Sequence, residues 1–214
     1  IVITSCSVAG VFLDGRKSAL SLGLEIPTAK QDPKDFSRYI RVGFELFITC
    51  LTTREPGNSV DDAPVVAAIV GFLQASIPTV TDIITCANEY VKANPGKTAI
   101  LNEWDKQIMH AVYKGFACIN MCIQYEYGNI LRECDGLSLL TEFVTIYADK
   151  WTESITYLDY YTKDVLDSVL DITCDVIDMS RRSGFGESDN GVQFIHQPCF
   201  SAICTKICTS SFVD

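Results

Sequence analysis

The amino-acid sequence predicts an all-α fold: a disulfide-stapled helical bundle of five to six helices with one long amphipathic helix at about residues 138–182. Three observations lead to this prediction. Apolar residues recur at helical spacing along most of the 214 residues, the alternation typical of strands is almost absent, and ten cysteines are spread along the chain. A chain of this length buries roughly 70% of its unfolded surface. We therefore expect a single all-α domain over residues 1–214, with 94–98 as the one place where it could divide.

The first well-marked helix is predicted from the residues at its start. Cys6 would tether an N-terminal segment that precedes this helix. Asp32 suits the N-cap, because its carboxylate accepts a bond from a free backbone N–H, and Pro33 suits the first helical position, where no N–H is needed. Apolar residues then repeat at helical spacing, which predicts a helix from Pro33 to about Thr53.

The next stretch is apolar and is predicted to be a buried helix that contains a proline. Asp62 caps it, and Pro78 is expected to end or kink it, since proline removes a backbone donor and clashes with the preceding turn. A second segment follows over residues 79–93. The sequence Asn-Pro-Gly at 94–96 is a stop signal.

The same apolar stretch is long enough to raise the question of a membrane span. Residues 63–81 carry no charge, and a span needs about 20 apolar residues. Two prolines and several polar residues interrupt the stretch, however, so the continuous apolar run covers only 63–73. We therefore predict a buried helix and no membrane span.

A further helix is predicted from Thr98 to about Tyr127. Thr98 suits the N-cap, and Gly128 with Asn129 ends the pattern. The residues on its inner stripe are Leu101, Trp104, Ile108, Val112, Ile119 and Cys122.

The longest amphipathic pattern covers Ser138 to Arg182. At 3.6 residues per turn its apolar residues fall within a narrow arc and most of its acidic residues on the opposite side, which predicts one buried and one solvated face. The apolar stripe consists of Leu140, Val144, Tyr147, Trp151, Leu158, Val165, Val169, Ile172 and Val176. Aspartates at 164, 167, 171, 175 and 178 share one side of the helix, and they are either a solvated face or a contact for a cation or a basic partner.

The charge of the chain excludes some classes of partner. The net charge is −10 and the pI is about 4.6, whereas nucleic-acid binding needs clustered lysine and arginine, and anionic membrane surfaces attract basic segments. The mean hydropathy of +0.18 indicates much buried apolar area. We therefore expect no nucleic-acid partner.

The cysteine content indicates an oxidising compartment. An even number of cysteines spread along a chain is expected for disulfides in a secreted protein, and Ile1 fits a mature chain without its signal peptide. Buried thiols in a cytosolic protein are the alternative. No Cys-x-x-Cys pair occurs, so neither a zinc ribbon nor a thioredoxin-type redox site is expected. The cysteines expected to form five disulfides are Cys6, Cys50, Cys86, Cys118, Cys122, Cys134, Cys174, Cys199, Cys204 and Cys208.

Part of the cysteine spacing resembles that of a known family. The spacing Cys86-x31-Cys118-x3-Cys122 is similar to the first three cysteines of insect odorant-binding proteins, and Cys199-x8-Cys208 is similar to their last spacing. That family is all-α, disulfide-linked and carries small apolar ligands, so the resemblance implies a helical carrier. The two cysteines between these motifs depart from the family's pattern, and residues 1–85 have no counterpart in it.

The sequence lacks the common catalytic motifs. His110 falls on the outward face of its predicted helix, and His196 lies in a predicted loop. The motifs of serine hydrolases, zinc proteases, phosphate-binding loops, dinucleotide-binding folds and EF-hands do not occur. We therefore predict a non-enzymatic protein with no cofactor and no metal site.

These observations favour a secreted helical protein that binds a small apolar ligand or lipid in its interior. Its apolar content is high and catalytic groups are absent, and ligand pockets are mostly apolar with a few polar groups. The residues predicted to line the site are Phe72, Trp104, Ile108, Tyr147, Trp151, Leu158 and Tyr161.

Two other functions fit the same sequence. An effector or inhibitor acting through protein–protein contacts would have a solid core and an exposed apolar patch or acidic surface. A structural or storage protein would assemble through the long helix. Only the ligand carrier requires an internal cavity.

Overall fold

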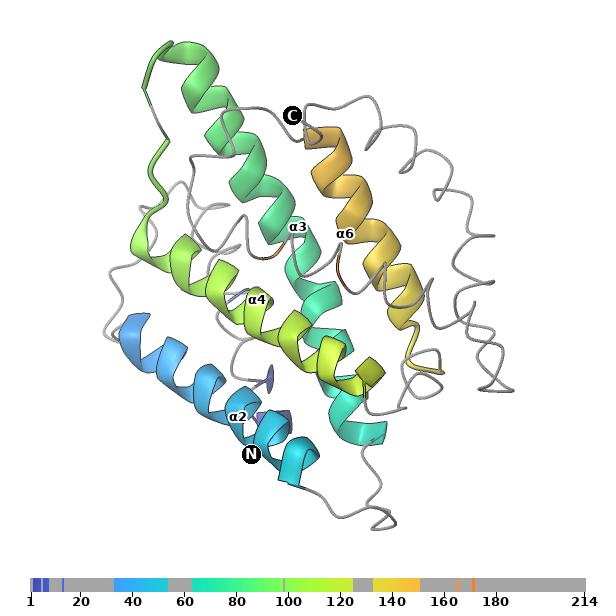
Figure 1. Cartoon of the computed structure of the whole chain (residues 1–214). Helices are drawn as coiled ribbons and strands as arrows, with labels where there is room; N and C mark the ends of the chain where they lie inside the picture. Colours follow the sequence, from blue (N-terminus) through green and yellow to red (C-terminus); the bar gives the residue numbers. More distant parts are fainter. Residues whose placement is uncertain are drawn as a thin grey trace.

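The computed structural model describes residues 2–4, 6–7, 13, 33–53, 63–97, 99–124, 133–150, 165 and 171. These residues are 89% helical and include no strand, so the all-α prediction is confirmed for this part of the chain. They include the long helices α2 (Pro33–Thr53), α3 (Ala63–Ala93), α4 (Glu103–Gln124) and α6 (Gly136–Lys150), shown in Figure 1. The predicted total of five to six helices and the disulfide staples stay predictions.

The helices pack as a bundle in which α4 and α3 lie between α2 and α6 (Figure 1). α2 lies beside α4, and α3 contacts both α4 and α6 (Figure 1). Two aromatic pairs join neighbouring helices. The ring centroids of Phe44 on α2 and Phe72 on α3 are 6.1 Å apart, and those of Phe116 on α4 and Phe143 on α6 are 4.7 Å apart in an edge-to-face arrangement. Edge-to-face pairs are favourable beyond the area they bury, because the positive edge of one ring meets the negative face of the other.

α2 agrees with its prediction at both ends. It begins at Pro33 and ends at Thr53. Phe44 and Phe47, three residues apart and so on one side of the helix, are buried, which agrees with the apolar repeat of this segment.

α3 continues through Pro78, so of the two predicted effects of this proline, an end or a kink, the end is excluded. It runs without a break from Ala63 to Ala93. A proline inside a helix costs about 3 kcal/mol, and fully burying one large aliphatic side chain contributes about 1.5–3 kcal/mol. Val80, Ile83 and Ile84, all beyond the proline, are almost fully buried. Packing of the second half of α3 therefore outweighs the local cost of the proline.

α3 is also long and apolar enough to cross a membrane, judged by length and composition alone. In the first half of α3, the buried apolar side chains are large, and several of the exposed residues are small. Ile69, Phe72 and Leu73 point into the protein core, whereas the exposed positions of its first half include Ala67 and Gly71. A helix with its large apolar residues turned inward and small residues outward has the pattern of a core helix.

α4 begins later than predicted. It starts at Glu103, so Thr98 is not its N-cap. Asn102 has that role: its side-chain oxygen accepts the backbone N–H of Asp105 at 2.9 Å, and its side-chain nitrogen donates to the Asp105 carboxylate at 2.8 Å. The three residues between the two candidate caps, 99–101, therefore lie outside the helix and belong to the connection that precedes it.

α6 is the described part of the predicted long helix. It begins at Gly136, directly after Asp135 turns the chain with a φ of 62°. Within 151–182 the structure describes Val165 and Asp171, both helical; the first is buried and the second exposed, as predicted. The continuity of the helix to residue 182 lies outside the described residues. The described apolar-stripe residues that are buried are Leu140, Val144 and Val165.

Candidate functional site

The structure describes three side chains of the predicted ligand site. Phe72 and Ile108 belong to one buried apolar core, and Trp104 is half-buried. The side chain of Tyr147 lies outside the described residues. The same is true of Trp151, Leu158 and Tyr161.

The described core is closely packed where α3 meets α4. A Cβ atom built on Gly115 would lie 2.8 Å from Cδ2 and 3.2 Å from Cγ of Leu73. Leu73 is fully buried. A methyl group on Gly115 would therefore require Leu73 to shift, because the α3–α4 contact is close at this level.

One buried hydroxyl departs from the pattern of its neighbours. Ser76 donates to the Leu73 carbonyl at 2.6 Å, and Thr81 donates to the Ile77 carbonyl at 2.8 Å. Thr79 is 2% exposed, yet its hydroxyl has no hydrogen-bond partner among the described residues. Buried polar groups are almost always hydrogen-bonded, so the Thr79 hydroxyl is an exception that calls for an explanation.

The described cysteines fall into two groups. Cys6 and Cys118 are buried, whereas Cys50 and Cys86 are exposed; Cys134 is intermediate. No disulfide joins any two of these five. The side chain of Cys122 and the cysteines at 174, 199, 204 and 208 lie outside the described residues, so the predicted pairing is untested.

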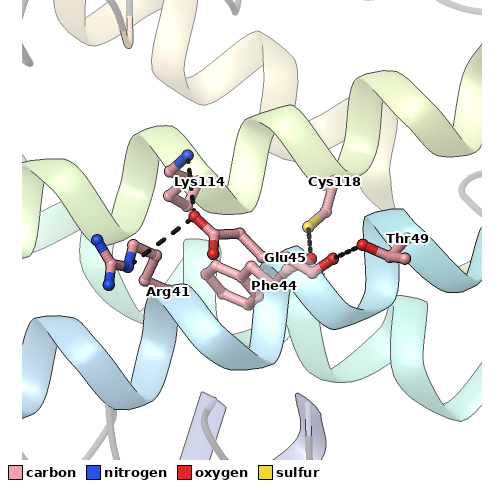
Figure 2. Close-up of polar contacts among 6 residues, drawn as sticks. All are labelled: Arg41, Phe44, Glu45, Thr49, Lys114 and Cys118. Carbon is pink, nitrogen blue, oxygen red and sulfur yellow. Dashed lines mark hydrogen bonds and ion pairs between the residues drawn. The ribbon is translucent and has the colours of Figure 1, made fainter.

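The two buried thiols, Cys6 and Cys118, are expected to react slowly. Burial raises the pKa of the Cys6 thiol to about 12, because the thiolate would lose its hydration. The Sγ atom of Cys118 lies 3.7 Å from the backbone carbonyl of Phe44, to which it donates (Figure 2). Neither thiol is therefore placed to act as a nucleophile.

We expect thiol alkylation to separate these two groups. In reduced, folded protein at pH 8, iodoacetamide should modify Cys50 and Cys86 well before Cys6 and Cys118, since reaction needs both access and thiolate. Timed labelling followed by peptide mass spectrometry measures the order. Circular dichroism of the reduced sample is the control for folding. Labelling of Cys6 at the rate of Cys50 would contradict the described burial.

A polar cluster lies on the outer side of the α2–α4 contact. The carboxylate of Glu45 is 3.9 Å from Nε of Arg41 and 3.8 Å from Nζ of Lys114 (Figure 2). Arg41 and Glu45 are about half exposed. Exposed ion pairs of this kind typically contribute 0–1 kcal/mol, so the cluster orients α2 on α4 more than it stabilises the fold.

The charges of this cluster act on His110 of α4. It is half-buried on α4 because α2 packs beside it, which the pattern of a single helix does not show. Burial lowers its pKa, and the charges of Lys114 and Arg41 lower it further, while Glu45 acts in the opposite direction. His110 is therefore a neutral imidazole at neutral pH.

We expect the protein to lose stability as the pH falls below 6.5, the ordinary pKa of histidine. The unfolded chain then takes up a proton that folded His110 binds less readily, so the free energy of unfolding decreases until the folded pKa is passed. Urea unfolding followed across this pH range measures the slope. His110→Gln should reduce the slope, whereas His196→Gln is the matched control. An unchanged slope in His110→Gln would contradict this assignment.

The most exposed apolar side chain among the described residues lies between α3 and α4. Residues 94–102, here called the α3–α4 connection, contain Ile100, which is 84% exposed. The next most exposed large apolar residue is Ile3 at 47%. Ala99 and Leu101, on either side of Ile100, are buried. The connection lies along one edge of the bundle (Figure 1).

Both ends of the α3–α4 connection are held by hydrogen bonds. At its start, the backbone N–H of Asn94 donates to the Tyr90 carbonyl at 2.9 Å, and Lys97 donates to the Asn94 carbonyl at 3.0 Å. Gly96 has a φ of 81°, a conformation that glycine adopts without strain. At its end, Asn102 caps α4 as described above. The exposed isoleucine is therefore carried by a segment that is anchored on both sides.

Sequence reasoning missed this feature because it extended the following helix to Thr98. The signal that could have located the connection is Asn102 followed three residues later by Asp105, a residue pair suited to a helix start. With the helix beginning at 103, the three apolar residues 99–101 fall outside it. Of these three, Ala99 and Leu101 are buried and Ile100 is exposed.

Among the described residues, no group of three or more His, Cys, Asp or Glu side chains could hold a metal ion. Comparisons of the chain with protein-family models, with curated proteins and with solved structures gave no match.

Proposed function

We propose that this chain is a secreted, non-enzymatic protein that acts by binding another protein through the α3–α4 connection. One observation carries the proposal: Ile100 is 84% exposed between two buried neighbours. Exposed apolar residues are common on protein surfaces. A large one that is almost fully in water, on a segment fixed at both ends, is what a binding anchor requires.

The energetics of Ile100 support this reading. Burying a side chain of its size in a partner contributes about 1.5–3 kcal/mol. Because the backbone hydrogen bonds of Asn94 and Lys97 and the Asn102 cap already hold the segment, little conformational entropy is lost on binding. In most interfaces a few such residues supply the greater part of the affinity.

A variant pair tests the proposal. Wild-type protein, Ile100→Asp and Ile3→Asp are immobilised separately and incubated with extracellular fluid from the natural source. We expect a protein that is retained by the wild type and by Ile3→Asp, the matched control at another exposed isoleucine, and that is lost with Ile100→Asp. Identical sets of retained proteins on all three supports would contradict the proposal.

Secretion is part of the proposal, and it is supported by the ten cysteines. Intact mass spectrometry of protein from the natural source tests it. With all ten cysteines in disulfides the chain is ten hydrogen atoms lighter than its reduced form. The mass of the fully reduced chain would contradict the predicted disulfides.

Binding of an apolar ligand is a second candidate, which Thr79 favours. Its buried hydroxyl has no partner among the described residues, and it lies seven positions along α3 from Phe72, on the same helix face. A few polar groups in an apolar lining are typical of ligand sites. The occupant would be a mainly apolar molecule with one hydrogen-bonding group.

Native mass spectrometry of the natural protein tests this second candidate. A reproducible added mass of a few hundred daltons is expected, and Thr79→Val, which keeps the side-chain shape and removes the hydroxyl, should reduce its occupancy. The variant should fold at least as stably as the wild type, because it removes an unbonded buried hydroxyl. A bare chain that also takes up no apolar dye would contradict this function.

A further inference from the structure

We draw no further inference here: the strongest candidate, the exposed surface patch of Val42, Leu46 and Cys50 along one side of α2, carries none, because nothing in the structure shows what covers it.

Discussion

Replacing Phe116 with alanine is expected to lower the free energy of unfolding by about 3–5 kcal/mol. Phe116 and Phe143 are both fully buried, and their rings meet edge to face with centroids 4.7 Å apart. The substitution removes the burial of a whole ring and leaves a cavity between α4 and α6. Urea or thermal unfolding followed by circular dichroism measures the loss.

A double-mutant cycle separates the ring contact from the burial. Phe143→Leu and the double variant complete the cycle, and we expect a coupling of about 0.5–1.5 kcal/mol between the two rings. Tyr90→Ala is the matched aromatic control, because Tyr90 is 45% exposed and surface substitutions usually stay within about 0.5 kcal/mol. Equal losses at Phe116 and Tyr90 would contradict the described core.

Gly115→Val is expected to destabilise the protein by about 1–3 kcal/mol, the typical cost of overfilling a packed interior. The first added carbon would lie 2.8 Å from Cδ2 and 3.2 Å from Cγ of the fully buried Leu73, so either this side chain or α4 would have to shift. The same unfolding measurements test this result. If α4 can move away from α3 at this level, the loss will be close to zero and the described contact is wrong.

Two further variants make this prediction specific to the contact. Gly71→Ala on α3 is the matched glycine control: its added carbon would meet nothing within 4 Å, so we expect a gain of about 1 kcal/mol from helix propensity alone. Leu73→Ala should cost less in the Gly115→Val background than in the wild type, because the smaller side chain relieves the clash.

Local patterns predicted the parts of the fold that depend on local causes. The bounds of α2 agree with those predicted from Asp32, Pro33 and a regular apolar repeat. The burial of Ile108 agrees with its place on the apolar stripe of its predicted helix. Periodicity identifies the side of a helix that faces the core, but it does not distinguish a cavity wall from a filled interior. For that reason it could not decide whether Phe72 and Ile108 line a ligand site.

The features that the sequence did not predict depend on contacts between helices. Nothing near Pro78 in the sequence shows that Ile83 and Ile84 will be packed tightly enough to keep α3 whole. His110 faces outward on an isolated helix and becomes half-buried only because α2 lies beside α4. Ile100 was missed because Thr98 and Asn102 are both acceptable caps, and the burial of Ala99 and Leu101 outside the helix accompanies the second choice.

The burial of Cys6 has a consequence for the order of events during maturation. Disulfide exchange needs an accessible thiolate, and in the folded bundle Cys6 is buried with a pKa of about 12. If Cys6 enters a disulfide, the bond must form while the nascent chain is still open, before the helices close around it. Oxidation and folding of this region would then be kinetically linked, and a chain that folded first would retain a trapped, reduced Cys6.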